Sequence, residues 1–414
     1  MNSVKLPEYS WYEPRDVEYR LPDNWEVTVH NIAGHDKPAM KPEEIRKAVT
    51  SPIGMPPLRK LAKGRKEVAI LFDDLTRSTH VYEIVPHILE ELAEAGIQDD
   101  QIRFIAAIAN HQALDRISMV KKLGEEVLGR FSVYNHCPFM NCTDLGTTSY
   151  GTKALINSEV VHCDLIIGIG QIVPHPQYGF SGGAKIIVPG VSSYETVVAH
   201  HGVTHEPWKE ERRNQGLPSG GYVEGSPVTG DALEMAKMAG LDMIVDCLVN
   251  RMGETVSIYA GALEPTYAEA LKEVKEHYRS VNTRDNDIVI ANAFDKAAEY
   301  SMAMSSAFPA LKPEGGDAVI ITNSPSGQDI HYLFDNFGKT ISGKLGRSMG
   351  VPPHIGKLII YTEFPERRIL DRYLDRDKVL LISDWEQVIT TLEEAHPDGA
   401  KVTVYPSADI QYFS

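Results

Sequence analysis

The sequence lacks long hydrophobic runs and contains little cysteine. Only four of its 414 residues are cysteines, none of them in a CxxC pair, and a chain of this length does not need disulfide bonds. No window approaches the roughly 18 uninterrupted apolar residues that a membrane span requires. The first residues, MNSVKLPEYSWYEPRD, contain no apolar run behind a basic start, which argues against a secretory signal. We therefore expect a protein of the reducing cytoplasm.

Long basic runs are absent as well, and the formal net charge is −16. This balance argues against nucleic acids and anionic membranes as partners. It does not exclude a small anionic substrate, because a pocket can be locally positive within an acidic protein. The hydrophobic fraction of 43% leaves enough apolar material for a core in each half of the chain, and the length predicts two domains.

Apolar runs alternate with amphipathic segments along the first half. Buried strands are predicted at 67–74, 102–109 and 163–173, and helices at 81–95, 118–131 and 194–201. A glycine-, proline- and charge-rich stretch at 203–229 predicts a long loop or lid, followed by a strand pair at 242–250 and 254–260 and a helix at 265–278. Strand, helix and strand in this rhythm predict a mainly parallel sheet with right-handed crossovers.

The polar stretch 280–286 marks a boundary, after which the alternation restarts. Strands are predicted at 287–292, 317–323, 357–362, 379–383 and 401–405, and helices at 296–312 and 385–394. We therefore predict two α/β domains with mainly parallel sheets, at 1–280 and 285–414, and an active site in the cleft between them.

Ionisable residues follow three successive predicted strands, where ligands bind in open parallel sheets. Asp74, Thr76 and Arg77 follow the first strand, His111 the second and His175 the third. Polar residues after one strand would be ordinary in an α/β protein, but three sets together indicate a site. The guanidinium of Arg77 suits a carboxylate or a phosphate.

The most informative segment is 174–190, PHPQYGFSGGAKIIVPG. Ser181, Gly182 and Gly183 allow the backbone to pass close to a ligand, because glycine has no Cβ. Lys185, at the end of this loop, is either a phosphate clamp, an amine used covalently, or a lysine that extends to solvent. The spacing is not that of a Walker A loop, since Ala184 stands where the second glycine would be.

Four histidines could instead form a zinc site: His175, His200, His201 and His205. Their separations are compatible with zinc, although no HExxH motif accompanies them. A zinc-dependent hydrolase or lyase is therefore the alternative function, and a non-catalytic binding protein is a third hypothesis.

Five features together resemble the nickel-dependent lactate racemase family. They are DLTR at 74–77, the strand-terminal His111, LGTTSYGT at 145–152, PHPQYGFSGGAK at 174–185, and His201 after the VPG turn. They keep the order and approximate spacing of that family. With the second domain, the resemblance covers most of the chain.

The resemblance implies a cofactor, the nickel pincer nucleotide (a nickel pyridinium-3-thioamide-5-thiocarboxylic acid mononucleotide). Lys185 would be tethered to it through a thioamide, and His201 would ligate nickel, with the neighbouring His200 as the competing choice. Further implied contacts to the nucleotide or its loop are Asp74, Thr76, Arg77, Ser181, Gly182 and Gly183. The host's cofactor-synthesis proteins would then be partners.

The activity implied is that of a racemase or epimerase, which inverts C2 of a small anionic 2-hydroxy acid by hydride transfer. His111 and His175 would act as the two acid/bases, with Arg77 binding the anion. The first domain would bind the cofactor, and the second would close the substrate site.

One family element, Tyr-Gln-x-x-Lys, is altered at 298–304 (AEYSMAM). Tyr300 is kept, Ser301 replaces the glutamine and Met304 replaces the lysine. A hydrogen bond to a charged group contributes about 1.5–3 kcal/mol, so this loss favours a larger hydroxy acid or a sugar acid over lactate. Tyr300, Ser301 and His331 are the predicted substrate contacts, and the other cations considered are Lys339, Lys344 and Arg347.

Overall fold

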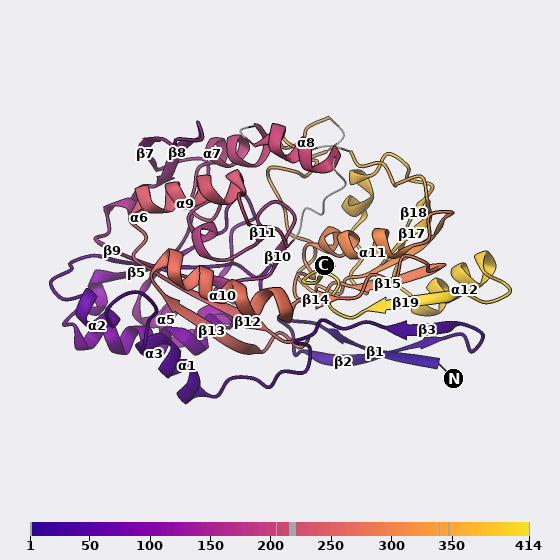
Figure 1. The fold of residues 1–414 in the computed structure, drawn as a ribbon, viewed down its shortest axis with the longest axis horizontal. Coiled ribbons are helices and arrows are strands. Elements are labelled where there is room, and N and C mark those ends of the chain that lie inside the picture. Colours follow the sequence, from indigo (N-terminus) through magenta and orange to yellow (C-terminus); the bar gives the residue numbers. More distant parts are fainter. Residues whose placement is uncertain (1, 204, 215–220, 339, 347, 414) are drawn as a thin grey trace.

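Two six-stranded sheets dominate the computed structural model, which describes residues 2–203, 205–214, 221–338, 340–346 and 348–413 (Figure 1). The first sheet has the order β13-β12-β9-β4-β5-β6 and is parallel except for β13, which is antiparallel to β12. The strands are β4 (Val68–Phe72), β5 (Ile102–Ala106), β6 (Ser132–Asn135), β9 (Leu165–Gln171), β12 (Met243–Val249) and β13 (Thr255–Gly261).

The second sheet has the order β18-β17-β16-β15-β19-β3 and is parallel throughout. Its strands are β3 (Glu26–Val29), β15 (Ile288–Asn292), β16 (Gly316–Ile321), β17 (Ile355–Tyr361), β18 (Val379–Ile382) and β19 (Lys401–Tyr405). The predicted α/β class with mainly parallel sheets is confirmed.

The start of the chain lies with the second sheet. Strand β3 forms an edge of it, and the hairpin of β1 (Asn2–Glu8) and β2 (Arg15–Leu21) shares a core with it, as the indigo strands beside β19 in Figure 1 show. The division at 1–280 and 285–414 stays a prediction about folding units. We call the first sheet with its helices the first unit, and the second sheet with its helices the second unit. Strands β1, β2 and β3, all before residue 30, lie with the second unit.

Helices cover both faces of the first sheet, which explains why β4 and β9 are almost continuously apolar. One core packs α1, α3, α4 and α5 against it, and another packs α6 and α9. The main helices are α1 (Pro42–Thr50), α3 (Val81–Glu94), α4 (Arg116–Leu123), α5 (Glu125–Arg130), α6 (Ser158–His162), α7 (Tyr194–Val198), α8 (Glu206–Asn214), α9 (Pro227–Ala239), α10 (Leu263–His277), α11 (Met304–Ala310) and α12 (Trp385–Ala395). Among the described residues, no helix is long and apolar enough to cross a membrane.

Three predicted elements differ from the structure. The helix predicted at 118–131 is divided into α4 and α5 at Gly124, whose φ of 84° ends the first helix. The helix predicted at 296–312 begins only at η4 (Tyr300–Ala303), so that the preceding residues form a turn facing the other sheet. The predicted loop at 203–229 contains α8 and the start of α9, while residues 204 and 215–220 lie outside the described chain.

A buried lysine fixes the loop that follows β4. The Nζ of Lys122, on α4, donates to Asp73 Oδ1 at 2.8 Å and to the carbonyls of Arg77 and Thr79 at 2.7 and 3.2 Å. Lys122 is fully buried. Because all three ammonium protons have acceptors, this lysine determines the path of the loop that presents Asp74 to Arg77.

We expect Lys122→Met to lower the free energy of unfolding of the first unit by about 3–5 kcal/mol, since it leaves the Asp73 carboxylate buried without its charge partner. Urea unfolding at neutral pH measures this change. The control is Lys153→Met, whose ion pair with Asp144 is exposed and should matter by less than about 1 kcal/mol. Equal effects of the two substitutions would contradict the proposed clamp.

Candidate active site

A cavity of about 320 Å³ lies between the carboxyl ends of the two sheets, within the size range of small-molecule sites. Segments after β4, β5 and β9 line one side, and segments after β15 and β16 line the other. The residues predicted as catalytic, cofactor-binding, substrate-binding and nickel-ligating all line this cavity: Asp74, Thr76, Arg77, His111, His175, Ser181, Gly182, Gly183, Lys185, His201, Tyr300, Ser301 and His331.

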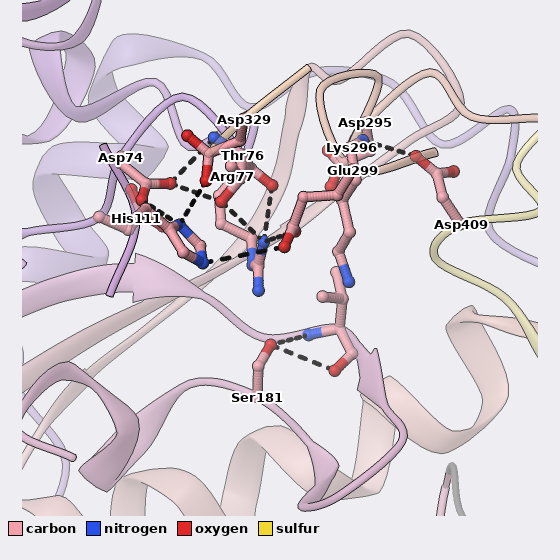
Figure 2. A network of polar contacts seen from close by, with 12 residues as sticks. Asp74, Thr76, Arg77, His111, Ser181, Asp295, Lys296, Glu299, Asp329 and Asp409 are labelled. Carbon is pink, nitrogen blue, oxygen red and sulfur yellow. Dashed lines mark hydrogen bonds and ion pairs between the residues drawn. The ribbon is translucent and has the colours of Figure 1, made fainter. Parts of the chain in front are cut away.

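His111 is surrounded by carboxylates from both sides of the cavity (Figure 2). Its Nδ1 lies 2.7 Å from Asp74 Oδ2 and 3.6 Å from Asp329 Oδ2, and its Nε2 lies 3.8 Å from Glu299 Oε1. Asp74 is oriented by the backbone N–H and the hydroxyl of Thr76, at 2.9 and 2.5 Å. Asp74 thus comes from the first unit, and the other two carboxylates come from the second.

This surrounding determines the charge of His111. Burial acts to lower its pKa, but the charge of Asp74 and the hydrogen bond to it, with a contribution from Asp329, outweigh burial and raise the pKa to about 10. Asp74 is the main partner, because burial raises the pKa of Asp329 itself to about 8. His111 is therefore an imidazolium at neutral pH. The same pair holds the pKa of Asp74 well below its usual range, despite the burial of that carboxyl group.

His175 has the opposite environment. Burial lowers its pKa well below the usual value, and the positive charges of Lys185, Lys296 and Arg77 lower it further. The ring is therefore neutral. The backbone N–H of Gln177 donates to its Nδ1 at 3.1 Å, which places the ring proton on Nε2. The two predicted acid/bases thus differ in protonation state.

Lys185 has the properties of a reactive amine. Burial, followed by repulsion from Arg77 and Lys296, lowers its pKa well below the usual value. Its Nζ lies 4.4 Å from the ring centroid of Tyr178. A buried amine whose pKa is lowered loses its proton more readily than an exposed lysine, and can therefore act more readily as a nucleophile.

The two adjacent histidines of the predicted nickel ligand are distinguished by position. Both lie in the π turn η3 (Ala199–Val203), but His201 lines the cavity, whereas His200 is fully buried behind it and is not among the lining residues. An imidazole at the cavity wall suits nickel(II), which accepts nitrogen and sulfur donors in square-planar sites. The donors present therefore fit the nucleotide cofactor implied by the sequence.

Hydrogen bonds to strand β12 and to neighbouring backbone hold the glycine-rich loop at 181–183 in place. The Gly183 N–H donates to both carboxylate oxygens of Asp246, on β12, at 2.9 and 3.1 Å. A Cβ on Gly182 would lie 2.9 Å from the same carboxylate, and this glycine has a φ of 81°. The Ser181 hydroxyl donates to the Gln171 carbonyl at 2.9 Å and accepts from the Val173 N–H at 3.0 Å. These contacts hold the backbone in place, and Lys185 with it.

The chain is similar to known proteins over most of its length. The family model described as the lactate racemase N-terminal domain matches residues 12–212. Lactate racemase from Thermoanaerobacterium thermosaccharolyticum is 26% identical, over 93% of this chain and 88% of its own. Lactate racemase from Lactiplantibacillus plantarum is 24% identical, over 98% of both chains. The chain carries the lactate racemase N-terminal domain and is distantly homologous to lactate racemases.

Solved structures confirm the fold. The lactate racemase apoprotein from Thermoanaerobacterium thermosaccharolyticum superposes with a TM-score of 0.74 at 21% identity, over the whole of both chains. A protein from Thermotoga maritima superposes with a TM-score of 0.64 at 17% identity, over 91% of this chain and 99% of its own. The family resemblance found in the sequence is therefore confirmed, together with its fold.

In the segment 298–304, where the lactate racemase element is altered, the side chains lie differently from the predicted substrate contacts. Tyr300 is only 2% exposed, and its hydroxyl accepts from Tyr373 at 3.2 Å. Met304 lies in the same core. The side chain that reaches the histidines from this segment is Glu299, which accepts from Arg77 at 3.0 Å. At this wall an acidic group therefore faces the cavity.

Four residues of the sequence could supply a positive charge in place of the family's lysine: His331, Lys339, Lys344 and Arg347. The His331 ring lies 4.9 Å from that of His111, but burial and the charge of His111 lower its pKa to about 3, so it supplies no positive charge. Lys344 is not a lining residue, and Lys339 and Arg347 lie outside the described residues.

Several lining residues were missed in the sequence: Glu299, Asp329, Arg368 and Arg372. Glu299 stands directly before the family's tyrosine, Tyr300, in the segment AEYSMAM. Asp329 stands two residues before His331. The two arginines have no sequence signal, because they lie on the irregular turn η5 (Arg367–Arg372).

We expect Asp74→Asn to lower the pKa of His111 from about 10 by roughly 1–3 units, because an amide supplies no negative charge to favour the imidazolium. NMR titration of the His111 ring in the apoprotein measures this shift. The control Asp144→Asn removes a distant surface carboxylate and should leave the titration unchanged. A His111 that titrates near pH 6.5 in the unmodified protein would overturn this account.

Proposed function

We propose that this chain is a racemase or epimerase that inverts C2 of a 2-hydroxy acid larger than lactate. One observation supports this above others. A single cavity brings together a buried amine of lowered pKa, an imidazole that can bind a metal, and two histidines that differ in protonation state. Inversion of C2 by removal and return of a hydride needs one base to take the proton of the hydroxyl group and one acid to return a proton to the oxygen.

The nickel pincer nucleotide, when bound, would supply a reversible hydride acceptor for the C2 hydrogen. Lys185 would hold it through a thioamide and His201 would ligate its nickel. The thioamide forms on the unprotonated amine of Lys185, so the lowered pKa of Lys185 favours formation of this bond. The anchoring of Gly183 on Asp246 would hold this lysine at a fixed place beside the histidines.

The protein's own histidines would move the hydroxyl proton. His175 is neutral and can accept the proton of a substrate hydroxyl group, once its Nδ1 releases the Gln177 N–H or its ring turns. We therefore expect the His175 ring to reorient when substrate binds. His111 is an imidazolium and donates a proton to the oxygen on the opposite face. Conversion of the other enantiomer requires the reverse protonation of the two rings.

The polar wall favours a large, hydroxyl-bearing substrate. Glu299 already pairs with Arg77. A small substrate that offers only a carboxylate would therefore bind a guanidinium whose charge is already partly neutralised. The Glu299 carboxylate accepts hydrogen bonds from hydroxyl groups, and the carboxyl group of Asp329, whose pKa burial raises to about 8, can accept or donate them. The methyl group of lactate forms no such hydrogen bonds. Arg372 and Arg368 extend the cavity further. A sugar acid or another long 2-hydroxy acid would use all of these groups.

The zinc-dependent alternative has one group of metal-ligand spacing in the described part of the chain, formed by His200, His205 and Asp231. All three are buried, and none of them lines the cavity. A catalytic zinc keeps a coordination position open to substrate. The geometry therefore favours the racemase proposal.

Loaded protein should invert C2 of a hydroxy acid or sugar acid in D2O without incorporating deuterium at that carbon, because the hydrogen returns internally. Protein produced with the host's cofactor-synthesis proteins is screened by chiral chromatography and NMR. His111→Gln and His175→Gln should each lower kcat by about 10²–10⁴-fold, with opposite preference between the two enantiomers. Normal turnover of both enantiomers by both variants would refute the assigned roles.

Mass spectrometry tests the cofactor separately. In protein made with the synthesis proteins, a peptide containing Lys185 should gain the mass of the nucleotide. Lys185→Arg should show no such gain, since the guanidinium stays protonated and is a poor nucleophile. An unmodified Lys185 in protein that nevertheless racemises substrate would contradict the tether.

A further inference from the structure

A hydrogen-bonded network lies behind the predicted nickel ligand, outside the cavity. His200 Nε2 lies 3.1 Å from the carbonyl oxygen of Val228, at the start of α9. His200 Nδ1 lies 3.2 Å from His201 Nδ1. Both contacts are buried.

The positions of the protons follow from these two contacts. A carbonyl oxygen only accepts hydrogen bonds, so the proton of His200 is on Nε2 and its Nδ1 has a free lone pair. The contact between the two Nδ1 atoms is then a hydrogen bond only if His201 donates. His201 consequently has its proton on Nδ1, and the nitrogen left for a metal is Nε2.

Neighbouring groups hold the His200 ring in this orientation. The ring of Tyr178 stacks on it, with centroids 5.5 Å apart and planes inclined by 26°. The Tyr178 hydroxyl lies 2.9 Å from the Val188 carbonyl and 3.3 Å from His200 Nδ1. Its single proton is donated over the shorter contact, to the carbonyl, which leaves the lone pair of His200 Nδ1 to His201. Turning the His200 ring over would place a carbon against the Val228 carbonyl and lose that bond.

Asp231 connects this network to the motif LGTTSYGT at 145–152, which has no role assigned above. Its carboxylate accepts from the hydroxyls of Thr148 and Thr152, at 2.7 and 2.6 Å, and contacts His205 Nε2 at 2.8 Å. Its Oδ2 lies 4.0 Å from His200 Nε2. The segment LGTTSYGT, at 145–152, thus supports α9 and the histidine turn rather than contacting the cavity through these threonines.

We propose that His200 and Asp231 are positioning residues, which fix the proton of His201 on Nδ1 and reserve Nε2 as the metal donor. Metal-bound histidines generally donate their second ring N–H to a fixed acceptor, which sets tautomer and orientation. Here another histidine is that acceptor, and its own tautomer is set by a backbone carbonyl. The identity of the metal rests on the proposed function, but the tautomer is a property of the apoprotein.

The test is long-range ¹H–¹⁵N NMR of histidine-labelled apoprotein. His201 should show a protonated Nδ1 and an unprotonated Nε2, and His200 the reverse. His200→Leu removes the acceptor and should abolish the Nδ1 preference of His201. His200→Asn places an amide oxygen near the former Nδ1 and should restore it, which a merely space-filling role would not. The control is His162→Leu, an exposed histidine on α6, which should change neither signal.

A second readout uses protein loaded with the nucleotide. His200→Leu should lose nickel to a chelator about 10–100-fold faster than the unmodified protein, and His200→Asn should recover most of this loss. An Nε2-protonated His201 in the apoprotein would overturn the proposal. So would stoichiometric zinc that co-purifies with the unmodified protein and is lost in Asp231→Asn, because the group would then be a metal site. Absence of racemase activity with the expected tautomers would refute the proposed function alone.

Discussion

The hydrogen bond between Asp74 and His111 is the interaction on which the site depends. It exists because the loop after β4 is held by the buried ammonium group of Lys122, so that Asp74 has one orientation toward the cavity. Thr76 uses two donors to keep that carboxylate in place. Without this bond, burial would favour a neutral His111, and both histidines would then be bases with no acid to complement them.

The cavity separates charge along its length. Carboxylates gather around His111, whereas Lys185, Lys296 and Arg77 gather around His175. The ammonium group of Lys296 is fully buried without a hydrogen-bond partner, and burial and the charge of Arg77 lower its pKa to about 8. An ammonium in such a place acts mainly through its field, because nothing in the described structure neutralises it directly. The field opposes a second positive charge on His175, and this keeps the two rings different.

The sequence predicted the parts of this arrangement that depend on local pattern. Apolar runs located β4, β5 and β9, and the rule that ligands bind beyond their carboxyl ends located Asp74, His111 and His175. Other parts depend on contacts between distant residues. Strand β3 is mostly exposed and short, so its place in the second sheet comes from pairing with β19. Asp231 is one aspartate on an ordinary amphipathic helix, and only the fold brings it to Thr148 and Thr152, some 80 positions earlier in the chain.

Glu299 shows why the charge of His111 belongs to the assembled protein rather than to either sheet. Asp74 comes from the first sheet's loops, but Glu299 and Asp329 come from the second, and all three lie within 4 Å of the ring. Each carboxylate near an imidazolium favours its charged form, and this effect falls with distance. The carboxyl groups that follow the strands of the second sheet therefore raise the pKa of His111, in opposition to the burial of the ring. The acid of the proposed reaction is complete only when both units surround it.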